Sequence, residues 1–168
     1  YSWAGTPFIT RAHPVERVAW TEAFRVLARV GLELPTEAQW EHAARAGTTA
    51  RFWTGDALAS LARRENCALP DGYGLTAPVD AFEPNPFGLH HVLGNVSEWC
   101  LDRFDQRLDP RPFAHGTGTR SPGYSDGRAY RGGTYAHPAA ALRPTRRYSR
   151  LPDQADQYIG IRPARALF

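Results

Sequence analysis

The sequence contains no lysine and no methionine, and it has only two cysteines. All 20 of its basic residues are therefore arginine, a bias that a GC-rich genome or a hot habitat would produce. Cys67 and Cys100 are too few for a disulfide scaffold and lack the Cys-x-x-Cys spacing of a zinc site. A single bridge and a pair of inert, partly buried thiols both remain open, and the lack of any sign of secretion favours the thiols.

Long apolar runs are also missing from the chain. No stretch approaches the roughly 18 residues that a membrane span needs, and no charged-then-apolar leader opens the sequence. A length of 168 residues with 42% hydrophobic and 22% charged content predicts one soluble domain over residues 1–168. Because the chain opens at Tyr1 without a methionine, we expect it to be the ordered part of a longer protein. No targeting signal is visible in the sequence, so its location, cytoplasmic or at the cell surface, stays open.

Acidic residues are scarce near the end of the chain. From Tyr130 onward there are seven arginines against Asp153 and Asp156, so the local balance is 7 − 2 = +5. Nucleic acid is one partner for such a tail, but no recognised binding motif accompanies it. The sequence therefore favours a solvated basic face and predicts no specific nucleic-acid partner.

Two helices are predicted in the first third. The first covers residues 22–31 and the second residues 37–47, and a glycine ends each of them. Thr36 caps the second helix, with Gln39 as its capping-box partner. The apolar stripe expected of the first helix consists of residues at helical spacing: Phe24, Val26, Leu27 and Val30.

The rest of the chain, residues 48–168, is rich in glycine, proline, aspartate and aromatics, which predicts brief strands and long loops. Loops of this length inside a compact domain must be pinned. Two segments, NCALPDGYG (66–74) and GNVSEW (94–99), combine side-chain oxygens with loop carbonyls, the ligands that calcium requires. Simple Asp-Gly and Gly-Asn turns are the alternative interpretation.

Three motifs occur in one order along the chain: LPTEAQWEHAARAG, APVDAFEPNPFGLHHVLGNVSEWCLD and YRGGTY…IGIR. Together they resemble the formylglycine-generating-enzyme family, a branch of the C-type lectin fold. The similarity extends from about His13 to Arg165. It implies an α+β domain with two helices, a small twisted antiparallel sheet and long ordered loops.

The same resemblance implies structural calcium. In the first site the oxygen ligands would be the side chains of Asn66 and Asp71 and the carbonyls of Cys67 and Tyr73. In the second site they would be the carbonyls of Gly94 and Val96 and the carboxylate of Glu98. There, His91 stands where the family has an Asn-type ligand, and imidazole is a poor partner for a hard cation.

Catalysis is a further point of comparison. The family's oxygenases bind copper through two cysteines, and His137 and Leu142 stand at those positions. Related sulfoxide synthases take their histidines largely from an extra helical domain that this chain lacks. We therefore predict a non-enzymatic protein. The alternatives are a metal-dependent oxidase of either type and an inactive homologue that acts as a structural or regulatory module.

Residues 130–162 are similar to the variable region of diversity-generating-retroelement variable proteins, in which adenine-directed copying errors rewrite Asn codons. Such codons cannot yield Lys, Glu, Gln, Trp or Met. The resemblance predicts binding of a macromolecule, most simply a protein, through a diversified surface. Its candidate variable residues are Ala136, His137, Ala140, Ala141, Arg146, Tyr148, Arg150, Leu151, Asp156 and Tyr158.

Overall fold

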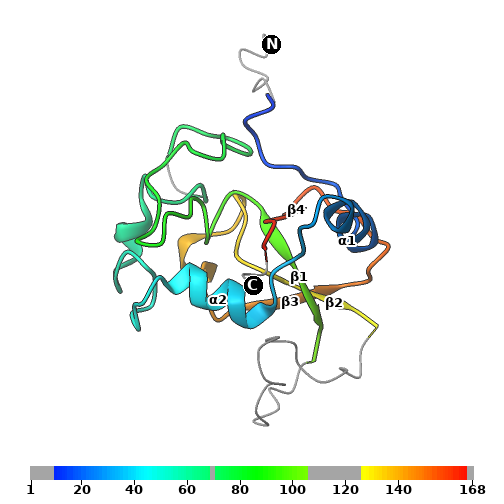
Figure 1. Ribbon diagram of the computed structural model, residues 1–168. Coiled ribbons are helices and arrows are strands. Elements are labelled where there is room, and N and C mark those ends of the chain that lie inside the picture. The colour runs from blue at the N-terminus through cyan, green and yellow to red at the C-terminus, as the bar shows by residue number, and fades with distance from the viewer. Residues whose placement is uncertain (1–9, 69–70, 106–125, 166–168) are drawn as a thin grey trace.

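The computed structural model describes residues 10–68, 71–105 and 126–165. Two helices lie on opposite sides of a small sheet, and long loops extend away from it (Figure 1). The α+β class is therefore confirmed. The elements are α1 (Trp20–Arg29), α2 (Glu37–Arg45), the 3-10 turns η1 (Leu58–Leu61) and η2 (Ala139–Ala141), and the strands β1 (Ser97–Arg103), β2 (Arg128–Arg131), β3 (Arg147–Arg150) and β4 (Ile159–Gly160).

Helix α1 begins two residues before its predicted start. Its N-cap is Ala19, and in its first turn the backbone N–H of Thr21 donates to the carbonyl of Pro152 at 3.0 Å. The predicted apolar stripe is wrong in three of its four positions, which are 44%, 55% and 65% exposed. The buried face consists instead of Trp20, Ala23 and Leu27, because these residues pack against the β1 and β4 side of the sheet.

Helix α2 follows its sequence signals closely. The Thr36 hydroxyl accepts the Gln39 N–H at 3.2 Å, and the Gln39 side chain accepts the Thr36 N–H at 2.8 Å. This reciprocal pair is the predicted capping box, now confirmed. The helix ends at Arg45, followed by Ala46 and Gly47 in the left-handed region.

The sheet has the strand order β3-β2-β1-β4 and is mixed. The pairs β3–β2 and β2–β1 are antiparallel, as predicted, whereas β4 pairs parallel to β1 through two residues. The expectation of a wholly antiparallel sheet is wrong, because the chain crosses from β3 to the opposite edge before it forms β4.

Hydrophobic residues form two clusters, one on each face of the sheet. On the α2 face, Cys100 and Ala129 pack with Trp40 and Leu142. On the α1 face, Trp99 packs with Trp20, Leu27 and Ile159, and Tyr130 joins the edge of this cluster. Alternate residues of β1 and β2 thus serve opposite sides of the sheet.

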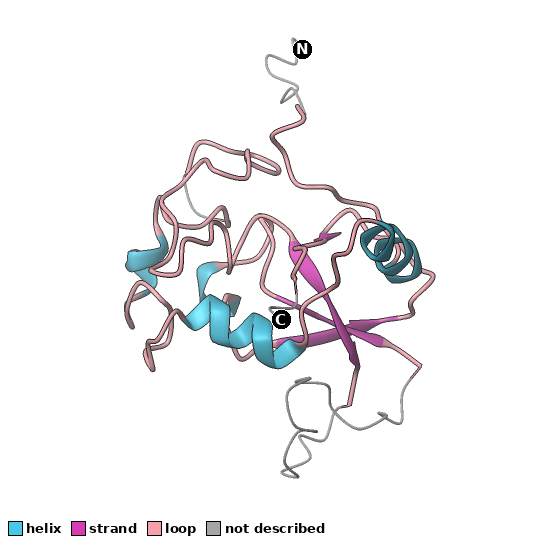
Figure 2. Ribbon diagram, in the orientation of Figure 1, coloured by secondary structure: helices cyan, strands magenta, loops and turns pink. Residues whose placement is uncertain are grey.

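The loops between α2 and β1 are pinned by backbone-directed hydrogen bonds, and most of this part is neither helix nor strand (Figure 2). Asn95 is the central residue: its N–H donates to the Asn66 carbonyl at 2.7 Å, and its side chain exchanges two bonds with the backbone of Ala77. Its carbonyl accepts from Tyr135 at 2.9 Å. Among the residues that the structure describes, neither helix is long and apolar enough to span a bilayer.

Candidate ligand-binding surface and cation site

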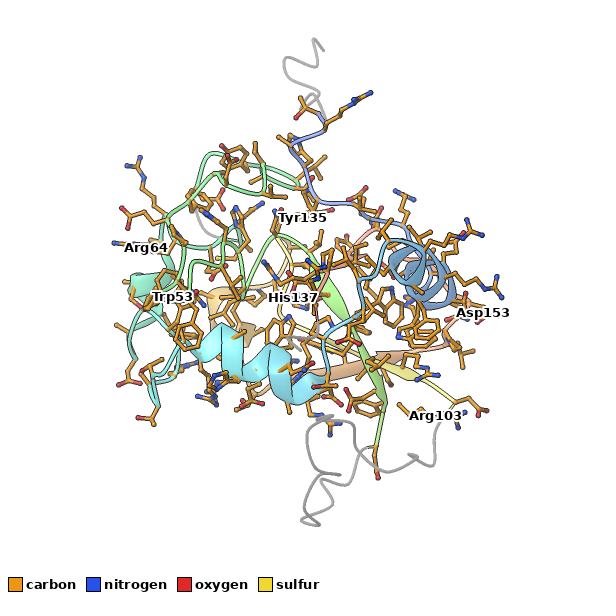
Figure 3. The ribbon with its side chains drawn as sticks, in the orientation of Figure 1. Trp53, Arg64, Arg103, Tyr135, His137 and Asp153 are labelled. Atoms are coloured by element: carbon orange, nitrogen blue, oxygen red, sulfur yellow. The ribbon has the colours of Figure 1, made fainter. Side chains whose placement is uncertain are left out.

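None of the ten candidate variable residues is buried, and five of them line one pocket of about 340 Å³. The pocket opens between β2, β3 and the segments around His137 and Tyr158, and Figure 3 shows His137 near the centre of the molecule. We call it the tyrosine pocket. Its lining residues are Ser97, Tyr130, Thr134, Ala136, His137, Tyr148, Asp156, Tyr158 and Ile159.

Strand β3 explains why neighbouring residues in this region behave differently. Its side chains alternate between the two faces of the sheet. Tyr148 lies opposite Tyr130 in the register and lines the tyrosine pocket. Arg150 pairs with Asp156 of the same pocket, whereas Arg147 points to α2. The candidate variable positions in this strand therefore share one face, and the other face holds the strand to the rest of the protein.

Aromatic rings form one wall of the tyrosine pocket. The Tyr130 and Tyr148 rings are stacked at 5.2 Å with 8° between their planes, and the His137 ring lies 6.0 Å from Tyr148. His137 Nδ1 is held by the Thr134 N–H at 3.1 Å. Burial, together with the nearby charge of Arg146, lowers the pKa of His137, which favours a neutral ring in this wall.

The acidic residue of the pocket is neutralised. Asp156 forms an ion pair with Arg150, and its other carboxylate oxygen accepts the Tyr158 N–H at 2.8 Å. Two candidate variable residues are thus bonded to each other, so their contributions to stability are coupled.

The predicted solvated basic face is wrong for three of the seven arginines. Arg131 is 3% exposed in its side chain and contacts Glu37 and Glu41, and Arg147 pairs with Glu37 at 2.6 Å. Arg162 pairs with Glu98 at 2.7 Å. The net charge counted from Tyr130 onward did not reveal these ion pairs, because all three carboxylates belong to segments upstream of Tyr130. Folding brings these segments against the C-terminal part of the chain.

The residues of the first predicted cation site lie in one hydrogen-bonded turn, and calcium there stays a prediction. Asn66 is fully buried; its Nδ2 donates to the Leu75 carbonyl at 2.9 Å, while its Oδ1 has no hydrogen-bond partner among the residues that the structure describes. The Asp71 carboxylate accepts the backbone N–H groups of Cys67 (3.2 Å) and Tyr73 (2.9 Å), which draws the turn together. A buried amide oxygen without a donor, on the residue before Cys67 whose N–H the carboxylate accepts, is compatible with a hard cation.

The second predicted site differs. The Glu98 carboxylate accepts Trp40 Nε1 at 2.6 Å and the Arg162 guanidinium at 2.7–3.1 Å, so a protein cation already faces it. Gly94 and Val96 lie beside Glu98 in a separate pocket of about 350 Å³. A second calcium site stays a prediction. Across residues 10–68, 71–105 and 126–165, no three His, Cys, Asp or Glu side chains form a metal-binding cluster.

His91 is buried and titrates far from its ordinary range. Burial lowers its pKa to about 4, while Nε2 hydrogen-bonds the Pro78 carbonyl at 3.1 Å. The unfolded chain takes up this proton near pH 6.5, so His91 should remove about 3 kcal/mol of stability as the pH falls from 6.5 to 4. Glu65 acts in the opposite sense, because burial raises its pKa to about 7.

The measurement is therefore a comparison of urea unfolding for the wild type and His91→Gln between pH 7 and 4. Gln retains an N–H donor for Pro78, and the Glu65 contribution cancels in the difference. The variant should lose less stability than the wild type on acidification. Parallel curves for the two proteins would contradict the assignment.

The two positions that the resemblance gives to copper-binding cysteines have separate environments. His137 lines the tyrosine pocket, whereas Leu142 is 1% exposed and belongs to the core on the α2 face. Cys67 and Cys100 are buried in that same core and are not bridged, and burial raises the pKa of Cys100 well above its usual value. Neither thiol lies in the pocket lining.

Sequence reasoning missed four residues that line the tyrosine pocket. They come from fixed parts of the fold, and only the β2–β3 register and the β1–β4 pairing bring them together. Alternation along YRGG could have suggested Tyr130, but no local signal marks the others. They are Ser97, Tyr130, Thr134 and Ile159. Conversely, five candidate variable residues lie outside the lining: Ala140, Ala141, Arg146, Arg150 and Leu151.

Comparisons with known proteins agree with this architecture. The model of the sulfatase-modifying factor enzyme 1-like domain matches residues 7–167. The formylglycine-generating enzyme of Thermomonospora curvata is 36% identical over 177 residues, covering 90% of this chain and 55% of that protein. The chain thus spans about half the length of the curated relatives it matches.

Solved structures show the same fold. PvdO from Pseudomonas aeruginosa superposes with a TM-score of 0.81 at 25% identity, covering 98% of this chain and 67% of that one. Treponema denticola variable protein 1 superposes with a TM-score of 0.80 at 24% identity, covering 96% and 75%. The expected C-type lectin-like fold of the formylglycine-generating-enzyme type is confirmed.

Proposed function

The chain belongs to the sulfatase-modifying factor enzyme 1-like family, and on that premise we propose that it is a non-enzymatic binding domain. Its ligand is a macromolecule, most simply a protein, bound by the ten candidate variable residues. The diversity of residues 130–162 arises by retroelement copying of the gene segment. The fold shared with Treponema denticola variable protein 1 agrees with this proposal.

The observation that carries the proposal is the separation of changeable from unchangeable side chains within one short segment. Four of the residues interleaved with the candidate variable ones are buried or bonded: Ala139, Leu142 and Ile159 lie in the core, and Arg147 is paired with Glu37. Others, such as Arg143 and Ser149, are exposed. The ten candidate residues remain at least partly exposed. Exposed side chains on a rigid support change at low cost in stability, typically within about 0.5 kcal/mol each.

The oxidase alternative is less well supported by the residues present. The copper-binding pair implied by the family is replaced by an imidazole and a buried leucine, and both thiols of the chain lie in the core. A thiolate pair that could bind Cu(I) at the tyrosine pocket is therefore not available from Cys67 and Cys100.

The proposal predicts that this surface tolerates wholesale change. We expect a displayed library randomised at the ten candidate positions, with codons that altered Asn codons can reach, to remain mostly folded and to yield binders to protein targets. A matched library randomised at Ala139, Leu142, Arg147 and Ile159 should mostly unfold, because these side chains pack or pair inside the protein. Protease resistance of the displayed chains measures the folded fraction.

Equal protease sensitivity of the two libraries, or a failure of the ten-position library to yield binders, would contradict the proposed function. The origin of the diversity has its own test. A near-duplicate of the DNA encoding residues 130–162 should lie beside a reverse transcriptase gene, and clones should differ at adenine-derived positions of the ten codons. A genome with neither feature contradicts the retroelement.

A structural calcium ion at the first site is part of the proposal. Asn66 and Asp71 would supply side-chain oxygens, and Cys67 and Tyr73 their carbonyls. Calcium at 100 times its dissociation constant should add about 2.7 kcal/mol, which raises Tm by roughly 5–10 °C. Differential scanning calorimetry with calcium and with a chelator measures this shift.

The matched controls are Asp71→Asn and Asp80→Asn. Asp71→Asn removes the only carboxylate of the four ligands and should abolish the calcium-dependent shift, whereas exposed Asp80 is not among them. A shift that survives in Asp71→Asn, or is missing from the wild type, would refute calcium at this site.

A further inference from the structure

The tyrosine pocket is a hollow within the proposed binding surface, and its chemistry restricts what can enter. Its volume of about 340 Å³ is at the lower end of the range for small-ligand sites, about 300–1,000 Å³, so it has room for one large side chain. Ile159 and Ala136 give it apolar surface, and three tyrosines and His137 add ring surface.

A cationic guest is disfavoured. The carboxylate in the lining belongs to Asp156, which is already paired with Arg150. A buried cation would have to compete with that arginine. An uncharged aromatic side chain would not have to displace Arg150 from Asp156, because offset and edge-to-face contacts with the tyrosine rings stabilise it.

The rim of the pocket is positively charged. The Arg146 guanidinium lies 5.3 Å from the centre of the Tyr148 ring, and both Arg146 and nearby Arg143 are exposed. Neither forms an ion pair with a carboxylate in the part of the chain that the structure describes. An anion beside the pocket mouth would therefore be attracted.

We infer that the tyrosine pocket receives an aromatic side chain of a protein partner, flanked by an acidic residue that meets Arg146. This inference rests on the proposed function and specifies the anchor that this version of the surface recognises. Aromatic anchors in pockets dominate the energetics of many protein interfaces, and charges at the rim set orientation.

The test uses the intact 168-residue chain and three capped tripeptides as probes, with binding followed by the amide chemical shifts of Thr134, Ala136, His137, Tyr158 and Ile159. Acetyl-Asp-Phe-Asp-amide should shift these amides. Acetyl-Asp-Leu-Asp-amide, which lacks the ring, should bind about three- to tenfold more weakly. Acetyl-Lys-Phe-Lys-amide, with reversed charge, should bind about fivefold more weakly.

Variants locate the binding. Ala136→Trp, at an exposed lining position, should fill the pocket and abolish the shifts, whereas Ala28→Trp, exposed on α1 and outside both the lining and the ten candidate positions, should leave them unchanged. Arg146→Ala should remove the preference for the acidic over the basic peptide and keep the preference for Phe over Leu. Tyr158→Ala provides a second test of the pocket, by removing a ring instead of adding one.

Unshifted pocket amides, equal binding of the Phe and Leu peptides, or equal effects of the two Trp variants would overturn the inference. So would a response to adenosine monophosphate in place of the acidic peptide, since that would indicate a nucleotide. The proposed function is judged separately. It survives these outcomes if the ten-position library still yields binders, and it fails without them whatever the peptides do.

Discussion

Replacing Glu37 by alanine should lower the free energy of unfolding by about 3–5 kcal/mol, because it leaves the Arg147 guanidinium without its carboxylate partner and the buried Arg131 with Glu41 alone. Glu37 is 1% exposed and accepts Arg147 Nε and Nη2, each at 2.6 Å. Arg131 Nε lies 3.4 Å from the same carboxylate. The hydrogen bonds that Arg147 donates to Glu37 raise the pKa of Arg147.

The consequence reaches the binding surface. Arg131 Nη1 donates to the carbonyls of Pro144 and Arg146, each at 3.0 Å, so the Glu37 network holds the backbone that precedes β3. Faster hydrogen exchange in β3 should therefore accompany the loss measured by urea unfolding in Glu37→Ala.

The matched control is Glu83→Ala, since the Glu83 side chain is 70% exposed and pairs with Arg64 at the surface. Exposed pairs contribute about 0–1 kcal/mol, so this variant should unfold almost like the wild type. If the two variants lost the same small amount, the buried network would not be what secures β3.

Replacing Gly133 by alanine should cost about 3 kcal/mol, at the upper end of the range for overpacking a core. A Cβ at this position would overlap the Leu142 side chain and lie 2.6 Å from the Leu93 carbonyl oxygen. Leu142 is itself buried and cannot move aside without displacing the core on the α2 face. Thermal and urea unfolding measure the loss.

Gly74→Ala serves as the control, because a Cβ there meets nothing within 4 Å. It should change the free energy of unfolding by no more than about 0.5 kcal/mol. If the steric conflict is the cause, Gly133→Ala should cost less in a Leu142→Ala background than in the wild type. An equal cost in both backgrounds, together with a small effect of Gly133→Ala alone, would show that the backbone there is not tightly packed.

Much of the candidate site could be anticipated from residue types and motif order. The spacing of Asn66, Asp71 and Tyr73 placed a turn with interior oxygens, and the structure draws it together through local hydrogen bonds. The tyrosine pocket could not be anticipated as a pocket. Ser97 and Ile159 enter it through the parallel pairing of β1 with β4, which joins residues 62 positions apart (159 − 97).

By itself, the sequence determined the features whose causes lie within a few residues: the capped start of α2, the glycine-containing turns and the family to which the chain belongs. Short-range hydrogen bonds fix the start of α2 and the turns whatever surrounds them, and the order of the motifs identifies the family. Only the tertiary structure decided which face of α1 is buried and where the arginines of the tail find their carboxylates. Burial and charge pairing depend on surfaces contributed by distant segments, as when Glu37 meets Arg147 across 110 positions of the chain.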